Sequence, residues 1–197
     1  MKSHHVLVIP GLNDHLQYSK YVWATNVFWR KQGVVPHVVW MDWMIDQKPF
    51  NHRLKKLVSL IDSLSRENTL SLVGFSAGAS AAINAFYERK KVVHRVVSVC
   101  GRLRVGEGVT PTLIWASKFS KPFAESVRLC QIQQMKLTPQ DLKKVLCLRA
   151  WFDELVPEST SFLPGASNKT LPMVEHLLTG AAAATVFSKI IIDFIKS

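Results

Sequence analysis

Short apolar runs of strand length alternate along this chain with longer segments in which apolar residues recur at helical spacing. The short runs, such as VLVI and VVSVC, are continuously apolar, which is typical of strands buried on both faces of a parallel sheet. Six runs rich in apolar residues have strand length, at residues 5–9, 34–40, 69–73, 92–99, 144–150 and 169–174. The pattern therefore predicts an α/β fold built on about six parallel strands.

Segments of helical periodicity separate these runs. They lie at residues 17–31, 53–65, 77–89 and, as one closing helix, about 177–196. Successive parallel strands need crossover connections, and such crossovers are right-handed, so we expect helices on both faces of the sheet. No repeat, low-complexity tract or linker divides the chain, which predicts one domain spanning residues 1–197.

The alternation changes between residues 102 and 141. This segment is longer than one crossover helix requires, and it contains three prolines. A helix is expected around residues 123–135, and Thr138 followed by Pro139 is typical of another helix start. The segment is therefore a candidate insertion into the alternating pattern.

The stretch GFSAG, residues 74–78, lies between a predicted strand and a predicted helix. A residue at the tip of so tight a strand-turn-helix is held in a strained backbone conformation, and small residues two places to either side avoid clashes. Gly74 and Gly78 meet that requirement and leave the hydroxyl of Ser76 raised above the backbone. Ser76 is the candidate nucleophile; the alternative is a small-residue turn that allows close helix packing.

A serine hydroxyl is a poor nucleophile near neutral pH unless a base removes its proton. In such sheets the ligand lies beyond the carboxyl ends of the strands, and this rule sorts the seven histidines. His176 follows the last predicted strand at that end, so it is the predicted base, the alternative being an ordinary histidine at a helix start. The others lie near strand starts, inside a strand, at a helix start or in the first loop: His4, His5, His15, His37, His52 and His94.

The imidazole then needs a carboxylate that fixes its tautomer and stabilises its charged form. Asp153 follows the fifth predicted strand, again at the carboxyl end, and is the predicted acid. Glu154 and Glu158 lie close by in the sequence. Asp42, which follows the second strand, is the rival acid.

Two backbone amides are candidates for binding the oxyanion that forms during attack on a carbonyl group. The Ala77 amide lies at a helix N-terminus, where negative charge is stabilised. Gly11 follows the first strand in Pro-Gly-Leu-Asn and would let the Leu12 amide face the site. The alternative for the second stretch is a plain Pro-Gly turn.

These residues resemble the α/β-hydrolase superfamily in the order Ser, Asp, His, with VIPGLN as oxyanion loop, GFSAG as nucleophile elbow, WFDELVP as acid loop and EH as base. The short length and the aromatic first helix are similar to the small, single-domain serine hydrolases typical of bacteria. Pro-Gly in the first loop departs from the common His-Gly. The resemblance implies that residues 102–141 stand where larger relatives carry a lid.

The predicted activity is hydrolysis of a carboxylic ester or related acyl compound through an acyl-enzyme. Its site would consist of Ser76, Asp153 and His176 with the amides of Leu12 and Ala77, and its partner is a small-molecule acyl substrate. No cofactor is expected, and no spacing of His, Cys or carboxylate residues indicates a metal site. The alternative is a catalytically silent member of the same fold that binds a ligand or protein partner.

The charge and the cysteine content indicate which partners and which cellular compartment to expect. Lys and Arg number 25 against 14 Asp and Glu, a net charge of +11, yet no nucleic-acid-binding signature accompanies the charge. An RNA or anionic lipid partner is kept as a third hypothesis.

Three cysteines without paired spacing favour a reducing compartment. A strand-like run begins almost at once, leaving no room for a secretion signal, and the last apolar stretch is too short to span a bilayer; we expect a cytoplasmic protein.

Overall fold

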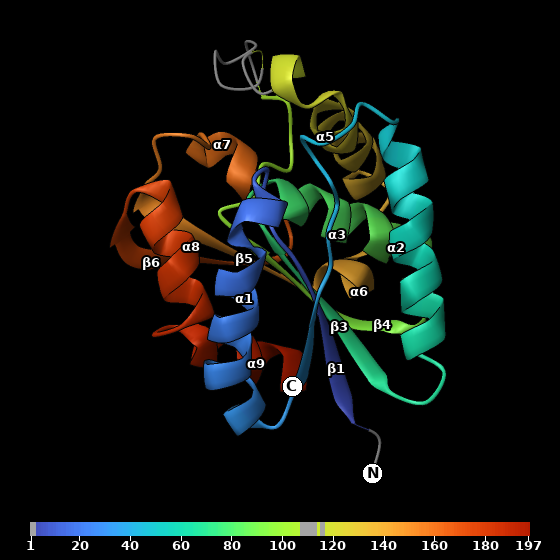
Figure 1. Cartoon of the computed structure of the whole chain (residues 1–197), viewed down its shortest axis with the longest axis vertical. Coiled ribbons are helices and arrows are strands. Elements are labelled where there is room, and N and C mark those ends of the chain that lie inside the picture. The colour runs from blue at the N-terminus through green and yellow to red at the C-terminus, as the bar shows by residue number, and fades with distance from the viewer. Residues whose placement is uncertain (1–2, 107–113, 115–116) are drawn as a thin grey trace.

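A computed structural model describes residues 3–106, 114 and 117–197 of the chain. Its strands are β1 (His4–Ile9), β2 (Val35–Val38), β3 (Thr69–Phe75), β4 (Val93–Val99), β5 (Val145–Phe152) and β6 (Ser167–Val174). They form one six-stranded sheet in the order β2-β1-β3-β4-β5-β6, and every neighbouring pair is parallel (Figure 1). The prediction of six parallel strands is confirmed.

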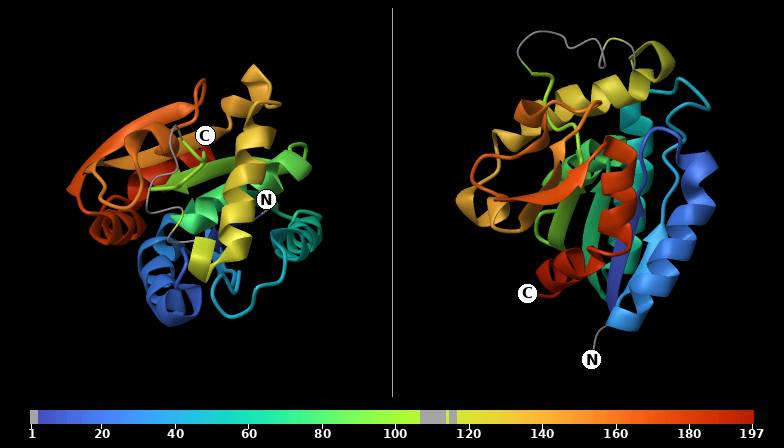
Figure 2. Two further views of the ribbon diagram at one scale, coloured as in Figure 1. Left: turned by 90° about the horizontal axis from the view of Figure 1, so that it is seen from above. Right: turned by 90° about the vertical axis from the view of Figure 1, so that its left-hand side faces the viewer.

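Helices cover both faces of this sheet, as the alternation predicted (Figure 2). One layer contains α1 (Asp14–Phe28), α8 (His176–Ala184) and α9 (Ser188–Lys196). The other contains α2 (Phe50–Leu64), α3 (Ala77–Glu88) and α5 (Lys121–Gln134). There are also short helical turns at η1 (Arg30–Gln32), α6 (Pro139–Leu142) and α7 (Glu158–Ser161).

The two layers enclose separate hydrophobic cores because side chains along each strand alternate between the faces of the sheet. In β1, Leu7 and Ile9 pack with α2, α3 and α5, whereas Val6 and Val8 pack with α1, α8 and α9. All four are fully buried. The continuously apolar strands therefore reflect burial on both faces, as their sequence indicated.

The prediction of one closing helix was wrong, because the structure has α8 and α9 with a bend of 57° between them. The indole of Trp29 donates a hydrogen bond to the carbonyl oxygen of Ala184 at 2.8 Å, so this carbonyl is satisfied without a continuing helix. The bend turns Ile191 and Ile195 of α9 into the core under the sheet.

Within the described residues, no single helix is long and apolar enough to cross a membrane. The bent pair α8 and α9 passes that test of length and composition when the two helices are taken together. In the fold, both helices pack against strands of the sheet.

The helix expected within the segment 102–141 is α5, and it packs against α3 and α2 in the helical layer. It connects β4 to β5 as a crossover helix. Thr138 caps α6 as predicted, with its side chain accepting a hydrogen bond from the Asp141 amide at 3.2 Å. Part of the segment, residues 107–113 and 115–116, lies outside the described residues, and a lid role for it stays a prediction.

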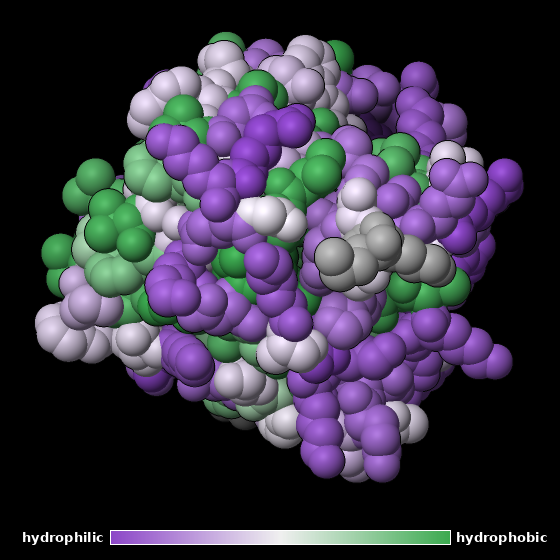
Figure 3. Space-filling view, turned by 90° about the horizontal axis from the view of Figure 1, so that it is seen from below, coloured by the Kyte–Doolittle hydropathy of each residue, from purple (hydrophilic) through white to green (hydrophobic). Residues whose placement is uncertain are grey.

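The face at the amino ends of the strands is largely hydrophilic (Figure 3). Exposed basic residues precede four of the strands there: Lys31, Arg66, Lys91 and Lys143. Part of the net positive charge therefore lies at the end of the sheet opposite to Ser76, which follows the carboxyl end of β3.

Candidate active site

Ser76 occupies a sharp turn between the end of β3 and the start of α3. Its backbone has φ 53° and ψ −118°, a conformation that a residue with a side chain adopts at a cost of about 1–3 kcal/mol. The Ser76 amide donates a hydrogen bond to the Val99 carbonyl oxygen at 2.9 Å, which ties the turn to the neighbouring strand β4. The structure thus places Ser76 at a strained turn beyond the carboxyl end of the sheet, as the sequence predicted.

The two flanking glycines are required by close backbone approaches. A Cβ atom on Gly74 would lie 2.4 Å from the carbonyl oxygen of Gly78. A Cβ atom on Gly78 would lie 2.0 Å from the carbonyl oxygen of Ile9 in the neighbouring strand β1. Both distances are far below van der Waals contact, so only glycine fits at either position without moving the backbone.

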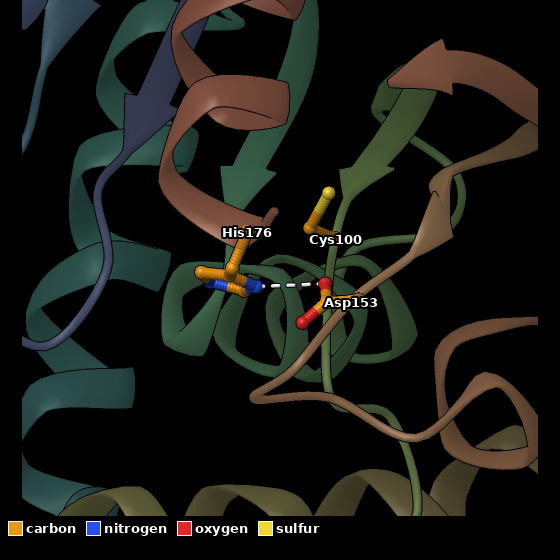
Figure 4. A group of neighbouring side chains, drawn as sticks. All are labelled: Cys100, Asp153 and His176. Atoms are coloured by element: carbon orange, nitrogen blue, oxygen red, sulfur yellow. Dashed lines mark hydrogen bonds and ion pairs between the residues drawn. The ribbon is translucent and has the colours of Figure 1, made fainter. Parts of the chain in front are cut away.

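His176 connects Ser76 to Asp153. Its Nε2 lies 2.9 Å from the Ser76 Oγ, and its Nδ1 lies 2.7 Å from the Asp153 Oδ2 (Figure 4 shows the second contact). A carboxylate can only accept, so the imidazole proton belongs on Nδ1, and Nε2 is then free to accept from the serine hydroxyl. The fold brings together the three predicted side chains, of which Ser76 and His176 are 100 positions apart.

The acid and the base are each held by backbone contacts. The Asp153 Oδ1 accepts hydrogen bonds from the amides of Leu155 at 2.9 Å and Val156 at 2.8 Å. The amide of His176 donates to the Glu154 Oε2 at 2.9 Å, so the residue next to the predicted acid positions the backbone of the predicted base. These bonds hold the Asp153 carboxylate and the His176 backbone in place in the absence of a substrate.

Glu175, which caps α8, also positions His176. Its side chain accepts hydrogen bonds from the amides of Leu177 and Leu178, and these bonds are the main reason that the pKa of its carboxyl group is lowered. The φ of Glu175 is 81°, another strained non-glycine residue. These contacts fix the direction in which the chain passes from β6 into α8. His176, the first residue of α8, is thereby directed toward Ser76.

The other candidate acids lie elsewhere. Glu158 forms an ion pair with Arg149. Asp42 donates its backbone amide to Asp14 at 2.8 Å, and no described contact joins its carboxylate to His176. Among the carboxylates considered from the sequence, it is Asp153 that contacts the imidazole.

The histidines assigned to the wrong end of the sheet do lie there. The Nε2 of His4 is 2.9 Å from the Ser71 Oγ, and the rings of His5 and His37 contact each other at 3.0 Å. Burial, followed by nearby cationic and imidazole groups, lowers the pKa of His4 to about 4. His37 lies inside β2, in register with Leu7, and no described contact joins any of these three histidines to Ser76.

The predicted oxyanion loop runs directly beside Ser76, because β1 pairs with β3 and Ile9 is in register with Gly74. A Cβ atom on Gly11 would lie 3.0 Å from the Ser76 Cβ, which shows how close the loop approaches. The Ala77 amide is at the first position of α3, where a helix leaves amides without intrahelical partners. The roles of Leu12 and Ala77 as oxyanion donors stay predictions.

Asp14 is a buried carboxylate that sequence reasoning did not identify. It is 0% exposed and accepts hydrogen bonds from the amides of His15 at 3.0 Å, Met41 at 2.6 Å and Asp42 at 2.8 Å. Burial raises its pKa, and the three amides oppose that effect. Asp14 thereby joins the loops that follow β1 and β2, but an aspartate in the first turn of a helix is common on protein surfaces and gave no signal of this role.

Cys100 is the other missed residue. It follows β4 with φ 48°, is 2% exposed, and its Sγ lies with the donor atoms of Asp153 and His176 inside a group no wider than 4.8 Å (Figure 4). Burial, reinforced by the Asp153 carboxylate, raises the pKa of the thiol to about 12. A signal was available, because Cys100 lies at the carboxyl end of a strand just as Asp153 does.

No protein-family model and no curated protein sequence matches this chain. Solved structures do match it. A metagenomic carboxyl esterase superposes with a TM-score of 0.72 at 14% identity, over 100% of this chain and 76% of that chain. The pyrethroid hydrolase PytH gives a TM-score of 0.71 at 12% identity, over 100% of this chain and 99% of that chain. A monoacylglycerol lipase from Paleococcus ferrophilus gives 0.66 at 15% identity, over 97% and 93%. These likenesses confirm the predicted α/β-hydrolase fold.

Proposed function

We propose that this chain of α/β-hydrolase fold is a serine hydrolase that cleaves a carboxylic ester or a related acyl compound through an acyl-enzyme. The observation that carries the proposal is the continuous hydrogen-bonded chain from the Ser76 Oγ through His176 to Asp153, with contacts of 2.9 and 2.7 Å. A hydroxyl, a base and an orienting carboxylate in this geometry are what nucleophilic catalysis by serine requires.

In the acylation step, His176 Nε2 takes the hydroxyl proton as the Ser76 Oγ attacks the substrate carbonyl carbon. The imidazolium that forms is stabilised by the Asp153 carboxylate, which stays ionised. Collapse of the tetrahedral intermediate breaks the bond to the leaving group, which receives the proton from Nε2. The product of this step is an ester between Ser76 and the acyl group.

In the deacylation step, water attacks the acyl-enzyme while His176 again accepts the proton. Collapse of the second tetrahedral intermediate breaks its bond to the Ser76 Oγ and releases the carboxylic acid, and His176 Nε2 returns the proton to the Oγ. In both steps the amides of Leu12 and Ala77 would donate hydrogen bonds to the oxyanion, the second of them from the positive end of α3. Apart from the substrate and one water molecule, the proposed steps use side chains and amides of this chain.

The solved structures of the same fold support the class of reaction. Their names describe a carboxyl esterase, a pyrethroid hydrolase and a monoacylglycerol lipase. We therefore place the substrate among small acyl compounds, with ester hydrolysis first.

A fluorophosphonate probe tests the proposal, because it reacts covalently with an activated serine. We expect labelling of the wild-type protein, loss of labelling in Ser76→Ala and a strong reduction in His176→Ala. A series of aryl esters of increasing acyl length, assayed with the same variants, then gives the preferred substrate. Absence of labelling in a folded wild-type sample would instead favour a silent member of the fold that binds a ligand or protein partner.

An anionic partner is compatible with hydrolysis, because exposed cations such as Lys91 and Lys143 lie at the opposite end of the sheet from Ser76. Binding of RNA or anionic vesicles through that face would weaken steeply as salt is added. A hydrolase that also binds such a partner would keep its esterase activity at high salt while losing the partner.

A further inference from the structure

Three side chains able to bind a soft divalent metal ion meet beside Ser76. The donor atoms of Cys100, Asp153 and His176 all lie within 4.8 Å of one another. They come from three separate elements: the end of β4, the loop after β5 and the start of α8 (Figure 4). Cys100 is 2% exposed and His176 4% exposed, so the group is largely shielded from water.

The combination of donors selects the metal. A sulfur, an imidazole nitrogen and a carboxylate oxygen are the ligand types of Zn²⁺, whereas Mg²⁺ and Ca²⁺ prefer oxygen alone. Around a tetrahedral zinc ion, bond lengths of about 2.0–2.3 Å place ligand atoms roughly 3.3–3.8 Å apart. In the ion-free protein the three donor atoms lie within 4.8 Å of one another, and the His176 Nδ1 is 2.7 Å from the Asp153 Oδ2. Binding of an ion would therefore separate this pair and bring closer any donor atoms that lie more than about 3.8 Å apart.

The two ring nitrogens of His176 have different neighbours. Nε2 contacts the Ser76 Oγ, and Nδ1 contacts the Asp153 Oδ2. A metal ion bound by Asp153 would therefore meet the ring at Nδ1, on the side away from Ser76. From that position the ion cannot hold a water molecule against an acyl group on Ser76, so it would not serve as a catalytic zinc.

We propose that Cys100, Asp153 and His176 form an inhibitory binding site for Zn²⁺ and for the chemically similar ion Cd²⁺. The inference rests on the proposed function, because the ion would block the imidazole assigned as the base. It concerns an inhibitor of the site, in a protein for which no metal cofactor is expected.

The inhibition follows from the position of one proton. In the ion-free protein the neutral imidazole carries its proton on Nδ1 and accepts at Nε2. When the ion binds Nδ1, the neutral ring carries its single proton on Nε2, and the Cys100 thiol releases its proton to solvent. The Nε2–H then donates to the Ser76 Oγ and cannot take the hydroxyl proton, so acylation stops.

Binding is tested first without catalysis. In the Ser76→Ala variant the three ligands remain, and titration with Cd²⁺ under reducing conditions should develop a thiolate-to-metal charge-transfer absorption at one ion per chain. Adding Cys100→Ala, or separately Cys100→Ser, should abolish the absorption and weaken Cd²⁺ binding at least tenfold. Loss of a residue that only supports a ligand typically lowers metal affinity by about 10- to 100-fold, so loss of a ligand should lower it by at least as much. The matched control adds Cys130→Ala, a fully buried thiol in the opposite core, and should keep both signals.

Inhibition is tested second, on ester hydrolysis by proteins that contain Ser76. Zn²⁺ should inhibit the wild-type and Cys130→Ala proteins, with reversal by a chelator, and each variant is compared with its own metal-free rate. Cys100→Ala should need at least about tenfold more Zn²⁺. Circular dichroism confirms that each variant is folded.

The two proposals fail in different ways. Cd²⁺ binding that depends on Cys100, in a wild-type protein without hydrolase activity, would leave the metal site and remove the proposed function. Hydrolase activity with Cd²⁺ absorption that is absent, or unchanged in Cys100→Ala and Cys100→Ser, would overturn the metal site and leave the hydrolase.

Discussion

The carboxylate of Asp14 accepts a hydrogen bond from the backbone amide of Met41 at 2.6 Å, across 27 positions of sequence. This bond joins the loop after β1, which lies beside Ser76, to the loop after β2. Arg53 reinforces the second loop by donating from Nε to the Met41 carbonyl oxygen at 2.6 Å. The site is therefore supported by buried polar contacts as well as by the two hydrophobic cores.

Replacing Asp14 with alanine should lower the free energy of unfolding by roughly 3 kcal/mol or more, because three backbone amides lose a charged acceptor inside the protein. Denaturant unfolding followed by circular dichroism measures the change. The control is Asp193→Ala, an exposed aspartate that forms an ion pair with Lys189, which should change stability by less than about 1 kcal/mol. Equal effects of the two substitutions would show that Asp14 has no special structural role.

Asp153→Asn should reduce kcat for an aryl ester by roughly 10³- to 10⁴-fold, as expected when an amide favours the wrong imidazole tautomer. The same substitution at the rival acid, Asp42→Asn, should reduce kcat by less than about tenfold, since its carboxylate has no described contact with His176. Steady-state kinetics of both variants decides between the two residues. A large loss in Asp42→Asn with little loss in Asp153→Asn would reverse the assignment.

Substitution of glycine by alanine should have opposite effects in the elbow and in α8. Gly78→Ala should destabilise the protein by more than about 3 kcal/mol or prevent folding, because the new Cβ would lie 2.0 Å from the Ile9 carbonyl oxygen. Gly180→Ala, within α8, meets its nearest atom at 4.0 Å and should stabilise by about 0.5–1 kcal/mol. Thermal unfolding of the two variants gives the comparison, and a folded, fully stable Gly78→Ala would contradict the elbow geometry.

Stability should fall as the pH drops from about 6.5 toward 4, because burial lowers the pKa of His4 from 6.5 to about 4. The unfolded chain binds a proton at His4 in this window and the folded chain does not, so acid favours unfolding. His37 and His94 have pKa values lowered in the same direction, also by burial first. The contribution of His4 is at most about 3 kcal/mol.

The measurement is the free energy of unfolding at several pH values, for the wild type and for His4→Gln. The glutamine retains a polar contact for Ser71 but does not titrate. Its curve should therefore be flatter than that of the wild type between pH 6.5 and 4. Identical slopes for the two proteins would remove His4 as a source of acid sensitivity.

Most of the sheet could be predicted because its strands are short apolar runs separated by helical periodicity, and both patterns are local properties of the sequence. Helix boundaries were less accurate. The structure begins α1 at Asp14, three residues before the predicted start, and begins α2 at Phe50. The break between α8 and α9 depends on the contact of Trp29 with Ala184, and these residues lie 155 positions apart. No local pattern encodes a contact of that kind.

The sequence by itself determined the α/β alternation, the small residues at the Ser76 turn and the end of the sheet at which each polar residue lies. The last follows from chain direction, since parallel strands share one carboxyl end. Tertiary structure alone decided which of those polar residues are in contact. Asp153, and not Asp42, contacts His176, and Cys100 lies beside the imidazole. Asp14 is buried and joins the loops that follow β1 and β2. The physical reason is that strand order and crossover paths set distances of a few ångströms between segments that are remote along the chain.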